Sequence, residues 1–339
     1  MSEQEPPFVS ETDEDGVEVR RYEFTIKSVL EDARLDSYLA TRFPDYSRTF
    51  IKKLIDEDGI MVNGEPVKPA YSPKRGDDVM CLVPVVKQDY VPPEDIPLDI
   101  IYEDDYILVV NKPPDMVVHP SRGHQSGTLV NAIAYHCQSL SEGTGALRPG
   151  IVHRLDRDTS GAIMVVKDDS VHQELARQFH DREVKKEYLA VCEGIFDLDS
   201  DLIDAPIGKH VRHKEKMAVR WDEGKKARTV YQVEERLGRF TVVRCFPRSG
   251  RTHQIRVHLQ HLGHPIVADP NYGHRNRVYM SDLAGGEHHP AQEPVLERQA
   301  LHALRLTIHH PVLEKDMTFE AEIPSDIKRL IELLREHVA

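Results

Sequence analysis

The sequence predicts an α+β protein in which a small α/β module precedes a larger domain with a central mixed, mainly antiparallel sheet. Three observations lead to this prediction. From residue 100 onward, short apolar segments follow one another without a helix between each pair, which is typical of mixed rather than parallel sheets. A stretch rich in proline and acidic residues separates this region from the preceding residues. The 339 residues are enough for more than one hydrophobic core.

The N-terminal segment is acidic and has few apolar side chains. Residues 1–18 contain seven acidic residues and no Lys or Arg. Such a composition cannot bury enough apolar surface to order the chain, so we expect residues 1–20 to be a disordered tail. Apolar side chains then alternate at Tyr22, Phe24 and Ile26, which predicts a strand within residues 21–30.

Residues 21–84 are predicted to form a compact module. Leu35, Tyr38 and Leu39 have helical spacing, and a second helix is expected over residues 50–55, with Ser47 as its candidate N-cap. The other expected elements are strands at 60–62 and 79–83 and a hairpin turn at Asn63-Gly64.

The larger domain is predicted over residues 99–339, after a linker at 85–98 that contains Pro92, Pro93 and Pro97. Apolar runs predict strands at 106–111, 162–167, 188–193, 229–234 and 240–246. Helical spacing predicts helices at 128–136, 171–180, 254–262 and 327–337. Residues 274–299 are polar and are expected to form an inserted loop.

Composition excludes several classes of protein. No apolar run approaches the 18 residues of a membrane-spanning helix, and the acidic N-terminus is unlike a secretion signal, so we expect a cytoplasmic protein. The four cysteines are far apart and are expected to be core residues rather than disulfide or zinc ligands. His258, His261 and His264 have metal-ligand spacing, but no Cys or acidic residue accompanies them closely, so we expect no metal.

The charge is unevenly distributed along the chain. The net charge is −13, yet residues 205–260 contain fourteen Lys and Arg against five Asp and Glu. A concentrated basic surface can attract phosphates even on an acidic protein, because the local field decides binding. Either this segment is a solvated hairpin, or it holds a nucleic-acid backbone; Lys209, Arg212, Lys214 and Lys216 are its first candidates.

The most informative segment for chemistry is residues 153–161, His-Arg-Leu-Asp-Arg-Asp-Thr-Ser-Gly. It places Asp156 between two arginines, just before a tight turn into an apolar strand. A carboxylate held in this way could act as a nucleophile. It could equally fasten the turn through salt bridges.

These residues resemble the catalytic motif of the RluA/RluD family of pseudouridine synthases. Residues 250–256, Gly-Arg-Thr-His-Gln-Ile-Arg, resemble the same family's arginine motif. Shorter matches occur in the family's order at 111–113, 186–190, 263–266 and 301–303. Within the first module, Arg34-Leu35-Asp36, Ser47-Arg48, Val62-Asn63-Gly64 and Gly76-Asp77 resemble an S4-like RNA-binding domain.

The resemblance implies a function and a set of residues. It implies that the chain isomerises uridine to pseudouridine in structured RNA, with Asp156 as nucleophile on a flipped-out uridine, Arg256 as its partner and Tyr188 at the base. Arg154 would face RNA, Ile255 would pack against uracil, and His153 and Thr159 would support the site. In the S4-like module, the candidates for RNA binding are Arg34, Arg48, Lys52 and Lys53.

The combination of both domains favours large-subunit ribosomal RNA, or a pre-ribosomal particle, over transfer RNA as the partner. The reaction needs neither cofactor nor metal, and we expect a monomer. Three alternatives stay open. The chain could be a non-catalytic RNA-binding assembly factor, or a pseudouridine synthase that acts on transfer RNA. It could also hydrolyse a glycosidic bond with two carboxylates, Asp156 and Asp158.

Overall fold

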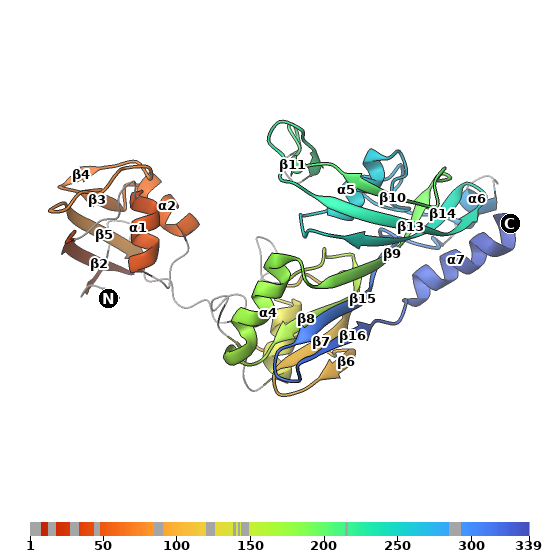
Figure 1. Ribbon diagram of the computed structural model, residues 1–339, viewed down its shortest axis with the longest axis horizontal. Coiled ribbons are helices and arrows are strands. Elements are labelled where there is room, and N and C mark those ends of the chain that lie inside the picture. Colours follow the sequence, from red (N-terminus) through yellow and green to blue (C-terminus); the bar gives the residue numbers. More distant parts are fainter. Residues whose placement is uncertain are drawn as a thin grey trace. The chain divides into compact units, whose positions relative to one another are not determined.

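The computed structural model describes the chain as two compact units, Met1–Tyr90 and Val91–Ala339, each of which is considered by itself (Figure 1). The residues described are 8–12, 18–27, 34–43, 48–84, 91–119, 126–137, 140–141, 143, 149–213, 216–284 and 293–338. Ser47, the candidate helix cap, and Lys214, a candidate RNA contact, lie outside them.

The described residues of the first unit form a five-stranded sheet and two helices. The strands lie in the order β1-β2-β5-β3-β4, and all of their pairings are antiparallel. Their bounds are β1 Phe8–Thr12, β2 Glu18–Thr25, β3 Ile60–Val62, β4 Glu65–Pro66 and β5 Asp78–Pro84. The helices are α1 Leu35–Arg42 and α2 Arg48–Asp56.

The core of the first unit follows from the predicted periodicities. Tyr22 and Ile26 of the β2 region are buried against Leu35 and Leu39 of α1, together with the apolar face of α2. The turn between β3 and β4 has positive φ at both Asn63 and Gly64, the conformation that a two-residue hairpin requires.

The prediction of a disordered tail over residues 1–20 is wrong for its described part. Strand β1 pairs with β2 from Phe8 opposite Tyr22 to Thr12 opposite Glu18. The rings of Phe8 and Tyr22 lie 5.5 Å apart, and the guanidinium of Arg20 lies over the Phe8 ring. Composition missed this strand because it is an edge strand, ordered by pairing rather than by burial of its own side chains.

Over the residues that the structure describes, the second unit is built on a nine-stranded sheet in which only β15 and β8 are parallel neighbours, so the predicted mixed, mainly antiparallel sheet is confirmed. The order is β10-β13-β14-β9-β15-β8-β7-β6, with β16 also paired to β15. Strand bounds are β6 Ile100–Glu103, β7 Ile107–Lys112, β8 Ser160–Val166, β9 Lys185–Glu193, β10 Ser200–Asp204, β13 Arg228–Leu237, β14 Phe240–Pro247, β15 Leu301–His310 and β16 Lys315–Glu320.

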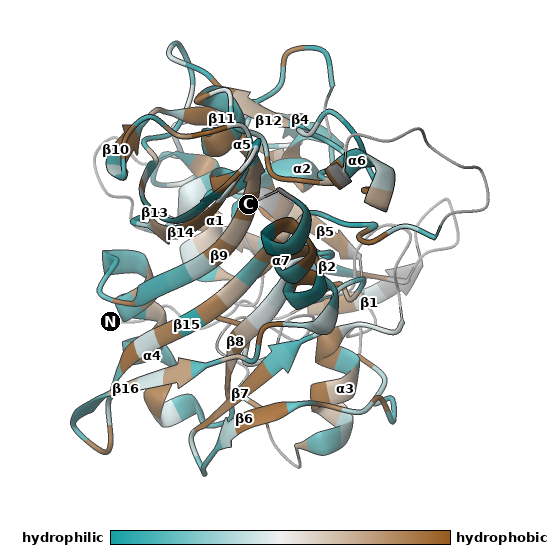
Figure 2. Ribbon diagram, turned by 90° about the vertical axis from the view of Figure 1, so that its right-hand side faces the viewer, coloured by the Kyte–Doolittle hydropathy of each residue, from teal (hydrophilic) through white to brown (hydrophobic). Residues whose placement is uncertain are grey.

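In the described part of this unit, a separate hairpin and five helices accompany the sheet. The hairpin pairs β11 Ile207–Lys209 with β12 Met217–Val219. The helices are α3 Leu129–His136, α4 Asp169–Asp181, α5 Gln254–His261, α6 Met280–Ala284 and α7 Ser325–Val338. Figure 2 shows polar and apolar bands on α7, whose apolar side, including Ile327 and Leu330, is buried in the core. Among the described residues, no helix has the length and apolarity needed to span a bilayer.

Two segments expected to be irregular pack against this unit in part. In the predicted linker, Val91 is buried, and the Pro92 carbonyl accepts a hydrogen bond from the Asn131 amide of α3. In the predicted inserted loop, Val278 pairs with Leu296, whose side chain is buried. Because most residues of these segments are proline or polar, the sequence did not indicate that a few apolar side chains within them are buried.

Candidate active site

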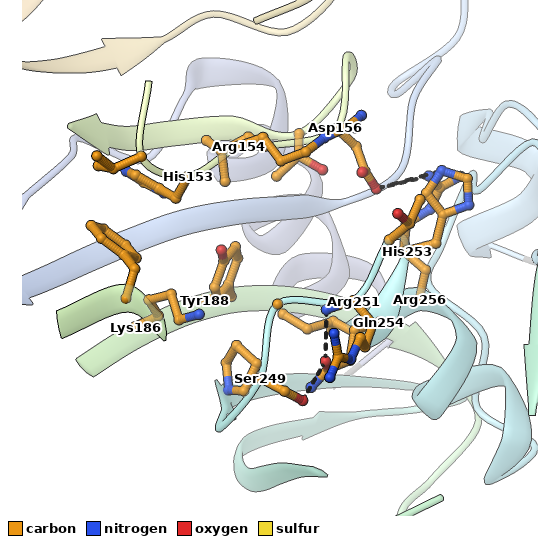
Figure 3. Close-up of a pocket in the computed structure, with 18 of the residues that line it drawn as sticks. His153, Arg154, Asp156, Lys186, Tyr188, Ser249, Arg251, His253, Gln254 and Arg256 are labelled. Carbon is orange, nitrogen blue, oxygen red and sulfur yellow. Dashed lines mark hydrogen bonds and ion pairs between the residues drawn. The ribbon is translucent and has the colours of Figure 1, made fainter. Parts of the chain in front are cut away.

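A cavity of about 720 Å³ opens in the second unit, between the two sequence motifs that were predicted to carry the chemistry. Its walls come from the 151–159 loop before β8, helix α4, strand β9 and the segment 247–256 that leads into α5. The lining includes Asp156, Arg256 and Tyr188, the three predicted catalytic residues (Figure 3). It also includes all four predicted substrate-binding residues: His153, Arg154, Thr159 and Ile255.

The loop that carries Asp156 is held at both ends. The Thr159 N–H donates to the Asp156 carbonyl at 3.1 Å, which closes a turn directly before β8. Leu155 is buried in the core beside α3. Gly161 has φ +117° and lies against Ala303 of β15, where a Cβ atom would approach the Ala303 carbonyl to 2.2 Å. The Thr-Ser-Gly sequence therefore anchors the loop to the centre of the sheet.

Asp156 and Arg256 come together from positions 100 residues apart. The Nη1 of Arg256 donates to Oδ2 of Asp156 at 3.1 Å (Figure 3). The Asp156 side chain is 19% exposed and the Arg256 side chain 4% exposed. The carboxylate of Asp156 is therefore accessible from the cavity, and the buried guanidinium of Arg256 holds its orientation.

Asp269 is a part of the site that the sequence analysis missed. Its fully buried carboxylate accepts from Nε of Arg256 at 2.6 Å and from Nη2 at 2.8 Å. It also accepts the backbone N–H groups of Asn271 and Tyr272. Burial opposes the charge of Arg256, but the hydrogen bonds and charge of Asp269, reinforced by Asp156, raise the pKa of Arg256 above its usual range.

His253 and Tyr272 lie against the same ion pairs. Nδ1 of His253 is hydrogen-bonded to the Tyr272 hydroxyl at 2.8 Å, and its Nε2 lies 4.0 Å from Oδ2 of Asp156. The guanidinium of Arg256 lies over the Tyr272 ring at 5.1 Å. Burial lowers the pKa of His253, although the charge of Asp156 opposes that shift.

Tyr188 and Ile255 form apolar walls of the cavity. Tyr188 projects from β9 (Figure 3), and burial, assisted by the negative charge of Asp156, raises the pKa of its hydroxyl. Ile255 is buried on α5, next to Arg256. A flat base could lie against these apolar side chains close to the carboxylate.

His153 and Thr159 are tied into the scaffold. The Met164 N–H of β8 donates to Nε2 of His153 at 2.9 Å, and the imidazole stacks on Phe179 of α4. Burial, assisted by the charge of Lys186, lowers the pKa of His153 to about 3, so its ring is neutral at pH 7. The buried Thr159 hydroxyl accepts from the Gln299 amide at 3.3 Å. Both support the walls of the cavity.

Basic side chains surround the cavity. Arg154 is exposed, and Arg182, Lys186 and Arg251 also line the walls. Burial, and secondarily the charge of Arg182, lower the pKa of Lys186. Together these groups form a positively charged mouth suited to a phosphate backbone.

Lys112 is a second part of the scaffold whose role was not predicted. Its ammonium is fully buried and donates to the carbonyl oxygens of Pro113, Met116 and Arg157 at 2.7–2.9 Å. Three acceptors match its three N–H donors. The contact with Arg157 ties the end of β7 to the residue that follows Asp156.

Some of the residues predicted to bind RNA are engaged in contacts within the protein, and others are exposed without such a contact being described. In the first unit, Arg34 and Arg48 both pair with the buried Asp36, and Lys53 pairs with Glu57, whereas Lys52 is exposed. On the β11–β12 hairpin, Lys209 and Arg212 are exposed, but Lys216 donates to the Asn271 carbonyl. The proximity of Asp36 to Arg34 in the sequence was the available signal that these charges serve the fold.

His258, His264 and the four cysteines pack within the fold rather than grouping around a common point. His258 is buried between the Thr229 hydroxyl and the Ala205 carbonyl, and His264 stacks on Phe196. All four cysteines are buried and free. Within the described ranges, no cluster of His, Cys, Asp or Glu could hold a metal ion.

Comparisons with known proteins agree with these features. Residues 106–261 match the family model for RNA pseudouridylate synthase, and residues 33–79 match that for the S4 domain. An uncharacterized RNA pseudouridine synthase of Bacillus subtilis is 41% identical over 94% of this chain and 100% of its own length. Ribosomal large subunit pseudouridine synthase D of Zymomonas mobilis is 39% identical over 89% of this chain and 93% of its own. The solved structure of human RNA pseudouridylate synthase domain containing 1 matches with TM-score 0.50 and 26% identity, covering 72% of this chain and 97% of that one.

Proposed function

The chain belongs to the RNA pseudouridine synthases, and from that premise we propose that it isomerises uridine to pseudouridine in large-subunit ribosomal RNA, with Asp156 as the nucleophile. One observation carries the mechanism: Asp156 is the carboxylate that lines the cavity, and the buried Arg256 holds it there. The choice of RNA rests on relatives such as the Zymomonas mobilis enzyme, whose name specifies the large ribosomal subunit.

The reaction breaks the bond between N1 of uracil and C1′ of ribose and rejoins the base through C5. In our proposal the Asp156 carboxylate attacks the sugar carbon as the N1 bond breaks, which leaves uracil as an anion in the cavity. Uracil turns, and C5 bonds to the sugar as the carboxylate leaves. The proton on C5 is then removed and N1 takes up a proton, so the product is an isomer of the substrate and no redox step occurs.

Arg256 orients the nucleophile in this proposal. A guanidinium fixes both the rotamer and the charge of a carboxylate through directed hydrogen bonds. Because Asp269 holds the other side of Arg256, the guanidinium cannot turn away when substrate enters. Pre-organisation of this kind avoids reorganisation at the moment of reaction.

The uridine must leave its stack to reach Asp156, as other base-modifying enzymes require. The apolar walls at Tyr188 and Ile255 suit an extruded uracil, and the exposed Arg154 is placed to contact the RNA left behind. The raised pKa of Tyr188 keeps its hydroxyl protonated at neutral pH, so it can donate a hydrogen bond to the base.

The test uses ribosomal RNA transcripts tritiated at C5 of uridine. The wild type should release tritium to solvent and the Asp156→Asn variant should not, although it keeps the shape of the side chain. Asp158→Asn is the matched control, because Asp158 pairs with Arg157 and is absent from the cavity lining.

Each alternative predicts a different result. RNA binding without tritium release by the wild type would favour an assembly factor. Release from transfer RNA transcripts alone would replace the ribosomal target. Free uracil among the products would indicate hydrolysis of the glycosidic bond.

A further inference from the structure

We infer that Trp221 is a stacking platform for an unpaired base of the RNA substrate, outside the catalytic cavity. The inference rests on the proposed function, since it assigns an additional contact to the same RNA. Trp221 lies in the segment between β12 and β13, and Figure 1 shows the neighbouring β11–β12 hairpin extending from the rest of its unit.

Trp221 is the only tryptophan of the chain, and its residue is 71% exposed. An indole carries a large apolar surface, so exposing it forgoes hydrophobic stabilisation that burial would supply. A flat, exposed aromatic ring is also the group on which single-stranded nucleic acids stack their bases.

Hydrogen bonds fix the backbone on either side of Trp221. The Gly224 N–H donates to the Arg220 carbonyl at 2.9 Å, and the Arg220 N–H donates to the Pro206 carbonyl at 2.8 Å. Gly224 leaves no room for a side chain, because a Cβ atom would lie 2.2 Å from the Arg220 carbonyl. A fixed platform loses little entropy when a base stacks on it.

The charges around Trp221 suit a polyanion. Its two acidic neighbours, Asp222 and Glu223, both pair with Arg220, which lowers the pKa of Asp222. The basic residues of this surface include the exposed Lys209, Lys225 and Lys226. An apolar partner protein would not use these cations, whereas RNA supplies a phosphate beside every base.

The segment that follows Trp221 contacts the wall of the cavity. The Arg251 side chain, part of the cavity wall, donates to the Lys226 carbonyl at 3.5 Å, and the Arg248 N–H donates to the Arg228 carbonyl at 2.9 Å. Lys226 is five residues after Trp221, so their Cα atoms are at most about 18 Å apart, roughly the rise of five stacked nucleotides.

The single tryptophan makes the test direct, because its fluorescence reports on this position alone. The full chain is titrated with a large-subunit ribosomal RNA transcript, a short oligouridylate, and an abasic oligomer of the same length. We expect the first two to quench the emission and the abasic oligomer, which has the phosphates but no bases, to leave it nearly unchanged.

Variants give an independent readout. Trp221→Ala should weaken binding of the transcript about tenfold, and Trp221→Phe, which keeps a ring, should stay within about threefold of wild type. The loss in Trp221→Ala should appear in KM rather than kcat. Leu313→Ala, which removes an exposed apolar side chain from the β15–β16 turn, is the control and should bind like wild type.

Two outcomes would overturn the inference: unquenched emission while filter retention shows transcript binding, or wild-type affinity in Trp221→Ala. If that variant kept its affinity but changed its oligomeric state, the ring would be assigned to contact between protein chains. Quenching measures binding and needs no turnover, so stacking is tested even if the wild type proves to lack synthase activity. A repeat with Asp156→Asn excludes a contribution from turnover.

Discussion

Arg256 is bound to Asp269 through two of its nitrogens, Nε at 2.6 Å and Nη2 at 2.8 Å, and only its remaining Nη1 reaches Asp156. The candidate nucleophile is therefore oriented by an arginine that a second, fully buried carboxylate has already fixed. Because that carboxylate also accepts two backbone N–H groups, its position is set by the loop after α5 rather than by the substrate.

Asp269→Asn should lower kcat while leaving KM close to wild type. The amide keeps the shape of the side chain but removes the charge and one acceptor, so Arg256 is free to shift toward Asp156 or away from it. We expect a loss in kcat of about 10- to 100-fold, the scale of removing about 1.4–2.7 kcal/mol of transition-state stabilisation. Single-turnover tritium release, with RNA affinity measured separately, checks it.

Glu320→Gln is the matched control for this change. Glu320 makes a similar two-nitrogen pair with Arg305, but on the exposed β15–β16 surface. Its activity should equal that of wild type. If Asp269→Asn were as active as Glu320→Gln, Arg256 would not depend on Asp269 for its position.

Lys112→Met should destabilise the second unit. The substitution keeps the volume of the chain stem but leaves the carbonyls of Pro113, Met116 and Arg157 without their shared donor. We expect the free energy of unfolding to fall by about 2–4 kcal/mol, measured by denaturant unfolding. Lys328→Met, which removes only an exposed pair with Glu322, should change it little; equal stability of the two variants would refute a structural role for Lys112.

Local patterns predicted most of the elements because their apolar side chains follow the period of the element that buries them. The strands β7 and β8 are near-continuous apolar runs, β9 and β14 each contain a shorter apolar run, and α4 and α7 are amphipathic. Strand β15 was missed as an element although its first three residues had been noted as a motif. Its sequence contains His302, Arg305, His309 and His310, whose burial or pairing depends on partners distant in sequence.

The same limit applies to the site. Asp156 and Arg256 could be paired from sequence because each belongs to a long motif. Asp269 could not, since nothing near it in sequence indicates a cation, and its role arises only when α5 turns Arg256 toward it. Arg34 and Arg48 illustrate the reverse case, in which a basic residue proposed for RNA is held by an acid of its own unit.

The pH dependence of stability should reveal the neutral state of His153. Its pKa is about 3 in the folded chain, against about 6.5 when unfolded, so the unfolded state binds the extra proton between these values. The contribution of His153 to the free energy of unfolding is therefore fully present above pH 6.5 and is lost as the pH falls toward 3. At pH 5 the loss is at most about 2 kcal/mol. His153→Gln can still accept from Met164 N–H but does not titrate.

The two proteins are compared by denaturant unfolding at pH 7 and pH 5. The stability advantage of wild type over His153→Gln should shrink as the pH is lowered. All other histidines are common to both proteins, so their titration cancels in the difference. Parallel stability curves would mean that His153 binds protons equally in the folded and unfolded states.

Gly161→Ala should be among the most damaging single-methyl additions in the chain. Gly161 has φ +117°, and its added Cβ would meet the Ala303 carbonyl at 2.2 Å and the Ala303 nitrogen at 2.6 Å, both in backbone that the sheet holds. Gly263, in the same unit, also has positive φ (+85°), but no atom of the described residues lies within 4 Å of the place that its added Cβ would take.

Comparing the two substitutions separates backbone strain from the clash. Gly263→Ala should cost only the strain of a left-handed alanine, about 1–2 kcal/mol. Gly161→Ala should cost that amount plus the separation of β8 from β15, so its melting temperature should fall well below that of Gly263→Ala in calorimetry. Activity should fall with it even below the melting transition, because the loop that carries Asp156 ends at this contact; equal melting temperatures would show that the sheet can open at Ala303 without cost.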